Sequence, residues 1–124
     1  MRSMGSTSDA IDLRALTLLS QQLDDSVVEA ILAAYLGQID QRSEELRTAI
    51  PDAGTRLRDA AHSLAASSLT VGAMRLGHLC RDIEAAVASE DDVRARELAH
   101  RALPEIGHVA TALASTRWAG SASS

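Results

Sequence analysis

The sequence predicts an all-α protein: an antiparallel up-down four-helix bundle with an additional short helix at its N-terminus. Of 124 residues, 23 are alanine, whereas the aromatic residues amount to one Tyr and one Trp, with no Phe. Alanine is the strongest helix former, and β-strands are enriched in β-branched and aromatic side chains. Apolar residues also recur at helical spacing in five stretches separated by short breaker signals, which predicts five helices.

The first two predicted helices follow from capping residues and apolar periodicity. We expect a short helix over residues 9–22, capped by Ser8 or Asp9. The polar run at 24–26 (Asp-Asp-Ser) then opens a long helix that ends near residue 50. Its apolar residues are spaced by three or four for most of its length, at Val28, Leu32, Tyr35, Ile39, Leu46 and Ile50.

Two shorter helices come next, bounded by residues that interrupt helical structure. Pro51 and Gly54 end the long helix, and a third helix covers residues 55–70. Gly72 marks a tight turn into a fourth helix over residues 72–89. The short turn predicts that these two helices form an antiparallel hairpin.

A fifth helix completes the bundle over residues 90–118, beginning with three acids and containing Pro104, which kinks it or starts a new turn. Long helices joined by short loops pack as antiparallel neighbours, so helices two to five form the bundle and the first caps one end. Residues 1–8 and 119–124 are rich in Gly and Ser or aperiodic. We interpret them as disordered tails or expression remnants flanking one domain over 9–118.

Charge and composition exclude several classes of function. The net charge is −5, from 17 acids against 12 arginines and no lysine, which argues against nucleic-acid binding through phosphate neutralisation. No apolar run approaches the roughly 20 residues of a transmembrane helix. The single cysteine, Cys80, and the lack of an apolar signal segment favour a cytoplasmic location. Because no P-loop or Gly-rich nucleotide turn occurs, we expect no kinase activity of its own.

Helical geometry singles out one histidine on the third predicted helix. At about 100° per residue, His62 lies roughly 140° from the core-facing side, which carries Leu57, Ala61, Leu64 and Ser68. On the fourth helix, Glu84 lies on the flank of the core-facing stripe of Ala73, Leu76, Cys80, Ile83 and Val87. If the turn centres on residues 72–73, His62 is level with Glu84, and Ala65 is level with Arg81.

A histidine beside a carboxylate has a specific chemical use. A carboxylate that accepts the Nδ1 hydrogen sets the imidazole tautomer and leaves the Nε2 lone pair free as a nucleophile. The alternative left open by geometry is an ordinary solvated surface histidine.

The run 61–84, AHSLAASSLTVGAMRLGHLCRDIE, resembles the histidine-containing phosphotransfer (HPt) domain, whose pattern is approximately A-H-x-L-K-G-S-S-x-x-x-G-A-x-x-L-x-x-x-C-x-x-L-E. The resemblance implies a phosphorelay intermediate in which His62 is the phosphoacceptor and Glu84 orients it. The phosphoryl group comes from the aspartate of a receiver domain and passes to another receiver. The implied partners are receivers of response regulators or hybrid histidine kinases, which hold the Mg²⁺ themselves, so we expect no cofactor here.

Two positions depart from the family pattern. The Lys three residues after the histidine is replaced by Ala65, and the following Gly is replaced by Ala66. We expect Arg81 and Arg58 to restore the missing positive charge near the phosphoryl group, with ordinary solvated charge as the alternative.

The expected docking surface for a receiver is a collar of small and apolar residues around the histidine, with one position on the second helix: Ala65, Ala66, Leu69, Gly77 and Gly37. The departures at 65 and 66 keep a second function open, a degenerate HPt-like module that binds receivers or a kinase without being phosphorylated.

A metal site is not expected. Glu105 and His108 stand at i, i+3 as in carboxylate-bridged metal bundles, but those bundles need the motif twice, and only one copy occurs. His78 and His100 are expected to be exposed.

Overall fold

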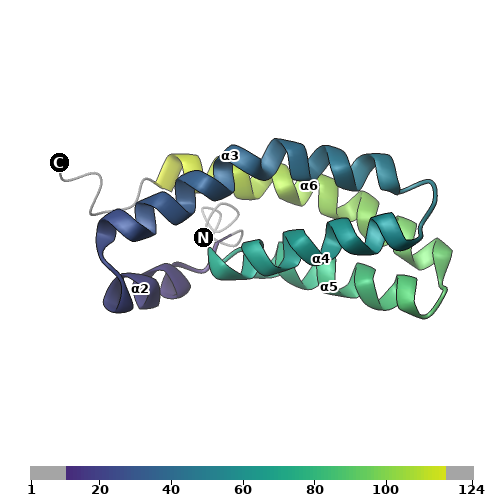
Figure 1. The fold of residues 1–124 in the computed structure, drawn as a ribbon, viewed down its shortest axis with the longest axis horizontal. Coiled ribbons are helices and arrows are strands. Elements are labelled where there is room, and N and C mark those ends of the chain that lie inside the picture. The colour runs from purple at the N-terminus through teal and green to yellow at the C-terminus, as the bar shows by residue number, and fades with distance from the viewer. Residues whose placement is uncertain (1–10, 117–124) are drawn as a thin grey trace, which may run out of the picture.

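The computed structural model describes residues 11–116, and these residues form helices and connecting turns without a strand (Figure 1). The short helix α2 (Leu13–Gln22) precedes four bundle helices: α3 (Asp25–Ala49), α4 (Thr55–Thr70), α5 (Met74–Ala88) and α6 (Asp92–Thr116). Around the bundle, α3 packs on α4, α4 on α5, α5 on α6 and α6 on α3. The predicted four-helix bundle with an extra N-terminal helix is therefore confirmed. The predicted tails and Trp118 lie outside the described residues.

The bundle helices differ in length, and this difference leaves space for α2 at one end of the bundle. Helices α3 and α6 have 25 residues each, whereas α4 has 16 and α5 has 15. At 1.5 Å per residue, the longer pair extends well beyond the α4–α5 turn. Helix α2 lies beneath the protruding part of α3, beside that turn (Figure 1). Ile11 and Leu16 are buried there, so this segment closes one end of the bundle, as expected.

The start of α2 differs from the prediction. The helix begins at Leu13 and not at residue 9, and its cap is Asp12, whose Oδ1 accepts the backbone N–H of Arg14 at 3.0 Å. The predicted caps Ser8 and Asp9 lie outside the described residues. The Asp12 N–H donates to the Gly72 carbonyl at 2.7 Å, so Asp12 is held in an extended conformation against the α4–α5 turn. This tertiary hydrogen bond has no signal in the local sequence.

Gly72 is required at that turn for two reasons. Its φ of +86° lies in the left-handed region, a backbone conformation that residues with a side chain rarely adopt. A Cβ added there would also lie 2.6 Å from the Asp12 carbonyl oxygen. The glycine therefore fixes both the reversal from α4 into α5 and the attachment of α2.

Helix α6 continues through Pro104 as one helical segment. It begins at Asp92 and not at residue 90, because Glu90 has a φ of +61° that a helix cannot include. Asp91, directly before the helix, accepts the Arg94 backbone N–H at 3.2 Å and caps its start. Pro104 has no N–H to donate to the His100 carbonyl, but both residues are exposed, so water can satisfy that carbonyl.

The core is built largely from small side chains. Eight of its buried residues on the last three helices and the α4–α5 turn are alanines: Ala61, Ala65, Ala73, Ala86, Ala95, Ala99, Ala102 and Ala112. One polar pair is buried among them, a hydrogen bond of 2.8 Å between Tyr35 Oη and Ser68 Oγ. Small interface residues let helices approach closely, and this approach positions the side chains described next.

Candidate functional site

The α4–α5 hairpin brings His62 and Glu84 together. Their Nδ1 and Oε1 atoms are 3.0 Å apart, at the level that the hairpin register predicted. The His62 side chain is 68% exposed and that of Glu84 is 21% exposed. The histidine therefore stands at the surface, while the carboxylate that contacts it is largely shielded from water.

The contact determines which ring nitrogen is free. An ionised carboxylate can only accept a hydrogen bond, so His62 Nδ1 carries the hydrogen and donates it to Glu84 Oε1. In the neutral ring this leaves a lone pair on Nε2. The other carboxylate oxygen, Glu84 Oε2, is buried and has no hydrogen-bond partner among the described residues. The site thus presents an oriented nitrogen nucleophile to solvent.

Close packing of α4 on α5 supports this geometry. The side chain of Leu69 lies over Gly77, where an added Cβ would be 2.6 Å from Leu69 Cγ. Ala65 is buried in the core. Larger side chains at 65 or 77 would displace neighbouring groups and move the hairpin helices relative to each other.

The same packing corrects the predicted docking collar. Ala65 and Gly77 are buried, so they lie beneath the surface and set the spacing of the helices. Ala66 on α4 and Gly37 on α3 are exposed, and Leu69 is half-buried. Helical angles alone misplaced Ala65 because it lies on the flank that α5 covers.

The two arginines expected near the phosphoryl group are both exposed. Arg58 lies one turn before His62 on α4, and Arg81 lies on α5. Neither guanidinium forms a hydrogen bond or ion pair with another residue in the range 11–116. The structure places them on the two helices of the site, each about one turn from His62 or Glu84 and without a hydrogen bond or ion pair to that pair.

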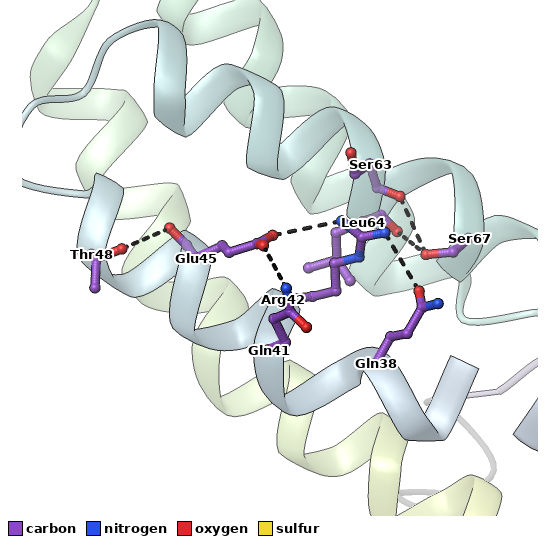
Figure 2. Close-up of polar contacts among 8 residues, drawn as sticks. All are labelled: Gln38, Gln41, Arg42, Glu45, Thr48, Ser63, Leu64 and Ser67. Carbon is purple, nitrogen blue, oxygen red and sulfur yellow. Dashed lines mark hydrogen bonds and ion pairs between the residues drawn. The ribbon is translucent and has the colours of Figure 1, made fainter. Parts of the chain in front are cut away.

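A groove between α3 and α4 was not predicted. It contains a hollow of about 280 Å³ lined by Ile31, Ala34, Tyr35, Gln38, Ser67, Thr70 and Val71. Arg42 reaches from α3 toward α4 beside this hollow (Figure 2), 3.4 Å from Gln38 Oε1 and 3.6 Å from Glu45 Oε1. The one sequence signal that could have indicated this groove is Arg42 itself, a charged residue between Ile39 and Leu46 in the apolar stripe of α3.

The remaining histidines are separate from this site. His78 and His100 are exposed, as expected. His108 Nδ1 is 3.6 Å from Oε1 of the buried Glu105, which is also 3.7 Å from Arg75. Over the described range, three or more His, Cys, Asp or Glu side chains nowhere gather in a way that could hold a metal ion. Within the same range, every helix is too short or too polar to cross a membrane.

An exposed histidine held by a carboxylate from the neighbouring helix of a four-helix bundle is typical of a domain that carries a phosphoryl group on histidine. The family model for the Hpt domain matches residues 30–116, a segment that contains both His62 and Glu84, and the chain belongs to this family. Comparison with curated proteins and with solved structures returns no match. The family acts in phosphotransfer within phosphorelays, and its members generally interact with receiver domains of response regulators.

Proposed function

We propose that this chain is a phosphorelay intermediate in which His62 accepts a phosphoryl group from a receiver-domain aspartate and passes it to another receiver. The observation that supports this proposal best is the exposed His62 ring with its Nδ1 held 3.0 Å from Glu84. A solvated surface histidine would not need a shielded carboxylate on the next helix.

The proposed reaction is an in-line displacement at phosphorus. The Nε2 lone pair of His62 forms the N–P bond while the bond from phosphorus to the aspartate oxygen breaks, and its electron pair leaves with the receiver carboxylate. The ring keeps its Nδ1 hydrogen and gains positive charge, which Glu84 stabilises through the same hydrogen bond. Attack on the phosphohistidine by the aspartate of a second receiver reverses these changes.

The phosphorylated site needs additional positive charge. A phosphoryl group brings up to two negative charges near Glu84, and two like charges about 4 Å apart repel by roughly 1–4 kcal/mol in surface surroundings. Arg81 and Arg58 are exposed and unpaired among the described residues, so their guanidinium groups are available to bind phosphoryl oxygens. We propose that they replace the lysine of the family pattern.

Receiver docking is proposed on the outer faces of α3 and α4. Ala66 and Gly37 are exposed and small, and each is next in sequence to a residue that lines the groove, Ser67 or Gln38. Small side chains leave room for a receiver to bring its aspartate to His62. The receiver would hold Mg²⁺ in its own acidic pocket, and this chain would supply the nucleophile without a cofactor.

The decisive experiment is phosphoryl transfer from a labelled phosphorylated receiver to His62→Gln, with His78→Gln as the matched control. We expect the first variant to retain its helical circular dichroism, because the side chain is exposed, and to take up no label. The control should be labelled like wild type, with an acid-labile bond. Uptake by His62→Gln would refute the assignment. A wild-type protein that binds receivers but takes up no label would favour the non-phosphorylated docking module.

A further inference from the structure

The two carboxylate oxygens of Glu84 have unequal surroundings. Oε1 accepts the His62 Nδ1–H at 3.0 Å, whereas Oε2 is buried and accepts no hydrogen bond within the described part of the chain. A carboxylate commonly shares its charge over several donors or water molecules. Here Oε2 is buried and accepts no hydrogen bond from a described residue. The side-chain hydrogen bond of Glu84 is therefore the one that Oε1 accepts from His62.

The buried residues at the level of Glu84 on α5 and α4 offer no strong hydrogen-bond donor. Cys80 lies one turn earlier on α5 and is fully buried. Burial raises the pKa of the Cys80 thiol to about 12, with a further contribution from the negative charge of Glu84, so the thiol stays protonated at neutral pH. A thiol is a weak donor. On α4, the register places the buried Ala61 and Ala65 near this level, and neither has a polar side chain.

We propose that the absence of a strong hydrogen-bond donor at position 80 helps to orient His62: the Cys80 thiol, a weak donor, leaves Glu84 Oε2 without a partner, so the carboxylate accepts its one side-chain hydrogen bond from His62 Nδ1–H. This inference rests on the proposed function, because it concerns how firmly the phosphoacceptor is oriented. The positive charge that develops on the ring during attack is stabilised by a carboxylate that accepts no second hydrogen bond from the described residues.

Two substitutions at Cys80 separate this role from simple packing. Cys80→Ser offers a stronger donor one turn before Glu84, and Cys80→Ala removes the thiol without offering one. We expect the serine variant to lower the fraction of the Nδ1–H tautomer of His62 in ¹⁵N spectra of the unphosphorylated protein. Its rate of phosphoryl uptake should fall roughly three- to tenfold, the range of one modest hydrogen bond. The alanine variant should match wild type in both measurements.

A double variant and a measurement on the unaltered protein complete the test. In a Glu84→Ala background, Cys80→Ser should change neither the His62 spectrum nor the uptake rate, because its effect passes through the carboxylate. Cys80 is the single cysteine, so the protein has one S–H stretching band in the infrared. We expect this band at the frequency of a thiol that donates no hydrogen bond, unchanged by Glu84→Ala.

Identical His62 spectra for the serine and alanine variants would overturn the inference. So would an S–H band of the wild-type protein that is shifted by hydrogen bonding and moves to the unbonded frequency in Glu84→Ala, because the thiol would then donate to the carboxylate. Because the spectra are recorded without phosphate, they are independent of the proposed function: a wild-type protein with the expected spectra and no uptake would refute the relay role alone.

Discussion

Replacing Glu84 by alanine tests how the site works and not only where it is. The substitution removes the acceptor of the 3.0 Å hydrogen bond from His62 Nδ1, so the ring can rotate and exchange tautomers. Hydrogen bonds to charged groups contribute about 1.5–3 kcal/mol, but His62 is 68% exposed and water replaces part of the lost interaction. We therefore expect about 1–2 kcal/mol in the transition state, a roughly 5- to 30-fold slower transfer.

The assay is the initial rate of label transfer from a phosphorylated receiver to the protein. Glu84→Gln should fall between wild type and Glu84→Ala, because an amide oxygen accepts the hydrogen bond without the negative charge. Asp82→Ala is the matched control, since it removes an exposed acid from the same helix and changes the net charge equally. Wild-type rates in Glu84→Ala would remove this residue from the site. Equal losses in Asp82→Ala would mean that net charge, and not the hydrogen bond, controls the rate.

Three further predictions concern docking, charge and the hairpin turn. Ala66→Trp should weaken receiver binding in titration calorimetry while circular dichroism is unchanged, because the position is exposed; unaltered affinity would place the docking surface elsewhere. Arg81→Ala should lower the steady-state yield of phosphohistidine, and less so at high salt because the interaction is exposed; an unchanged yield at low salt would exclude this arginine. Gly72→Ala should reduce the free energy of unfolding in urea by at least about 1–2 kcal/mol, because of its left-handed φ and the close Asp12 carbonyl. Gly37→Ala, on an exposed helix face with no atom within 4 Å of the new Cβ, should instead stabilise the protein; equal stability of the two variants would contradict the turn argument.

The elements that the sequence predicted well are those whose signals are local. The third predicted helix has the observed bounds of α4, and the predicted ends of α3 and α5 differ from the observed ones by one or two residues. Apolar periodicity and breaker residues lie within each segment, so no distant contact is needed to locate it. The contact between His62 and Glu84 was also predictable. A tight turn at Gly72 fixes the register of two adjacent antiparallel helices and so places the two residues opposite each other.

Other features depended on contacts between distant segments. The late start of α2 follows from the hydrogen bond between Asp12 and Gly72, 60 positions apart in the chain. The burial of Ala65 depends on how closely α5 approaches α4. The hollow between α3 and α4 depends on how those two helices pack against each other. By itself, the sequence determined the helices, their order and the residues able to carry the chemistry, because helix formation is governed by neighbours within a turn or two. Only the tertiary structure decided which flanking side chains are covered and that one oxygen of Glu84 lacks a donor, since burial depends on the distance between packed helices.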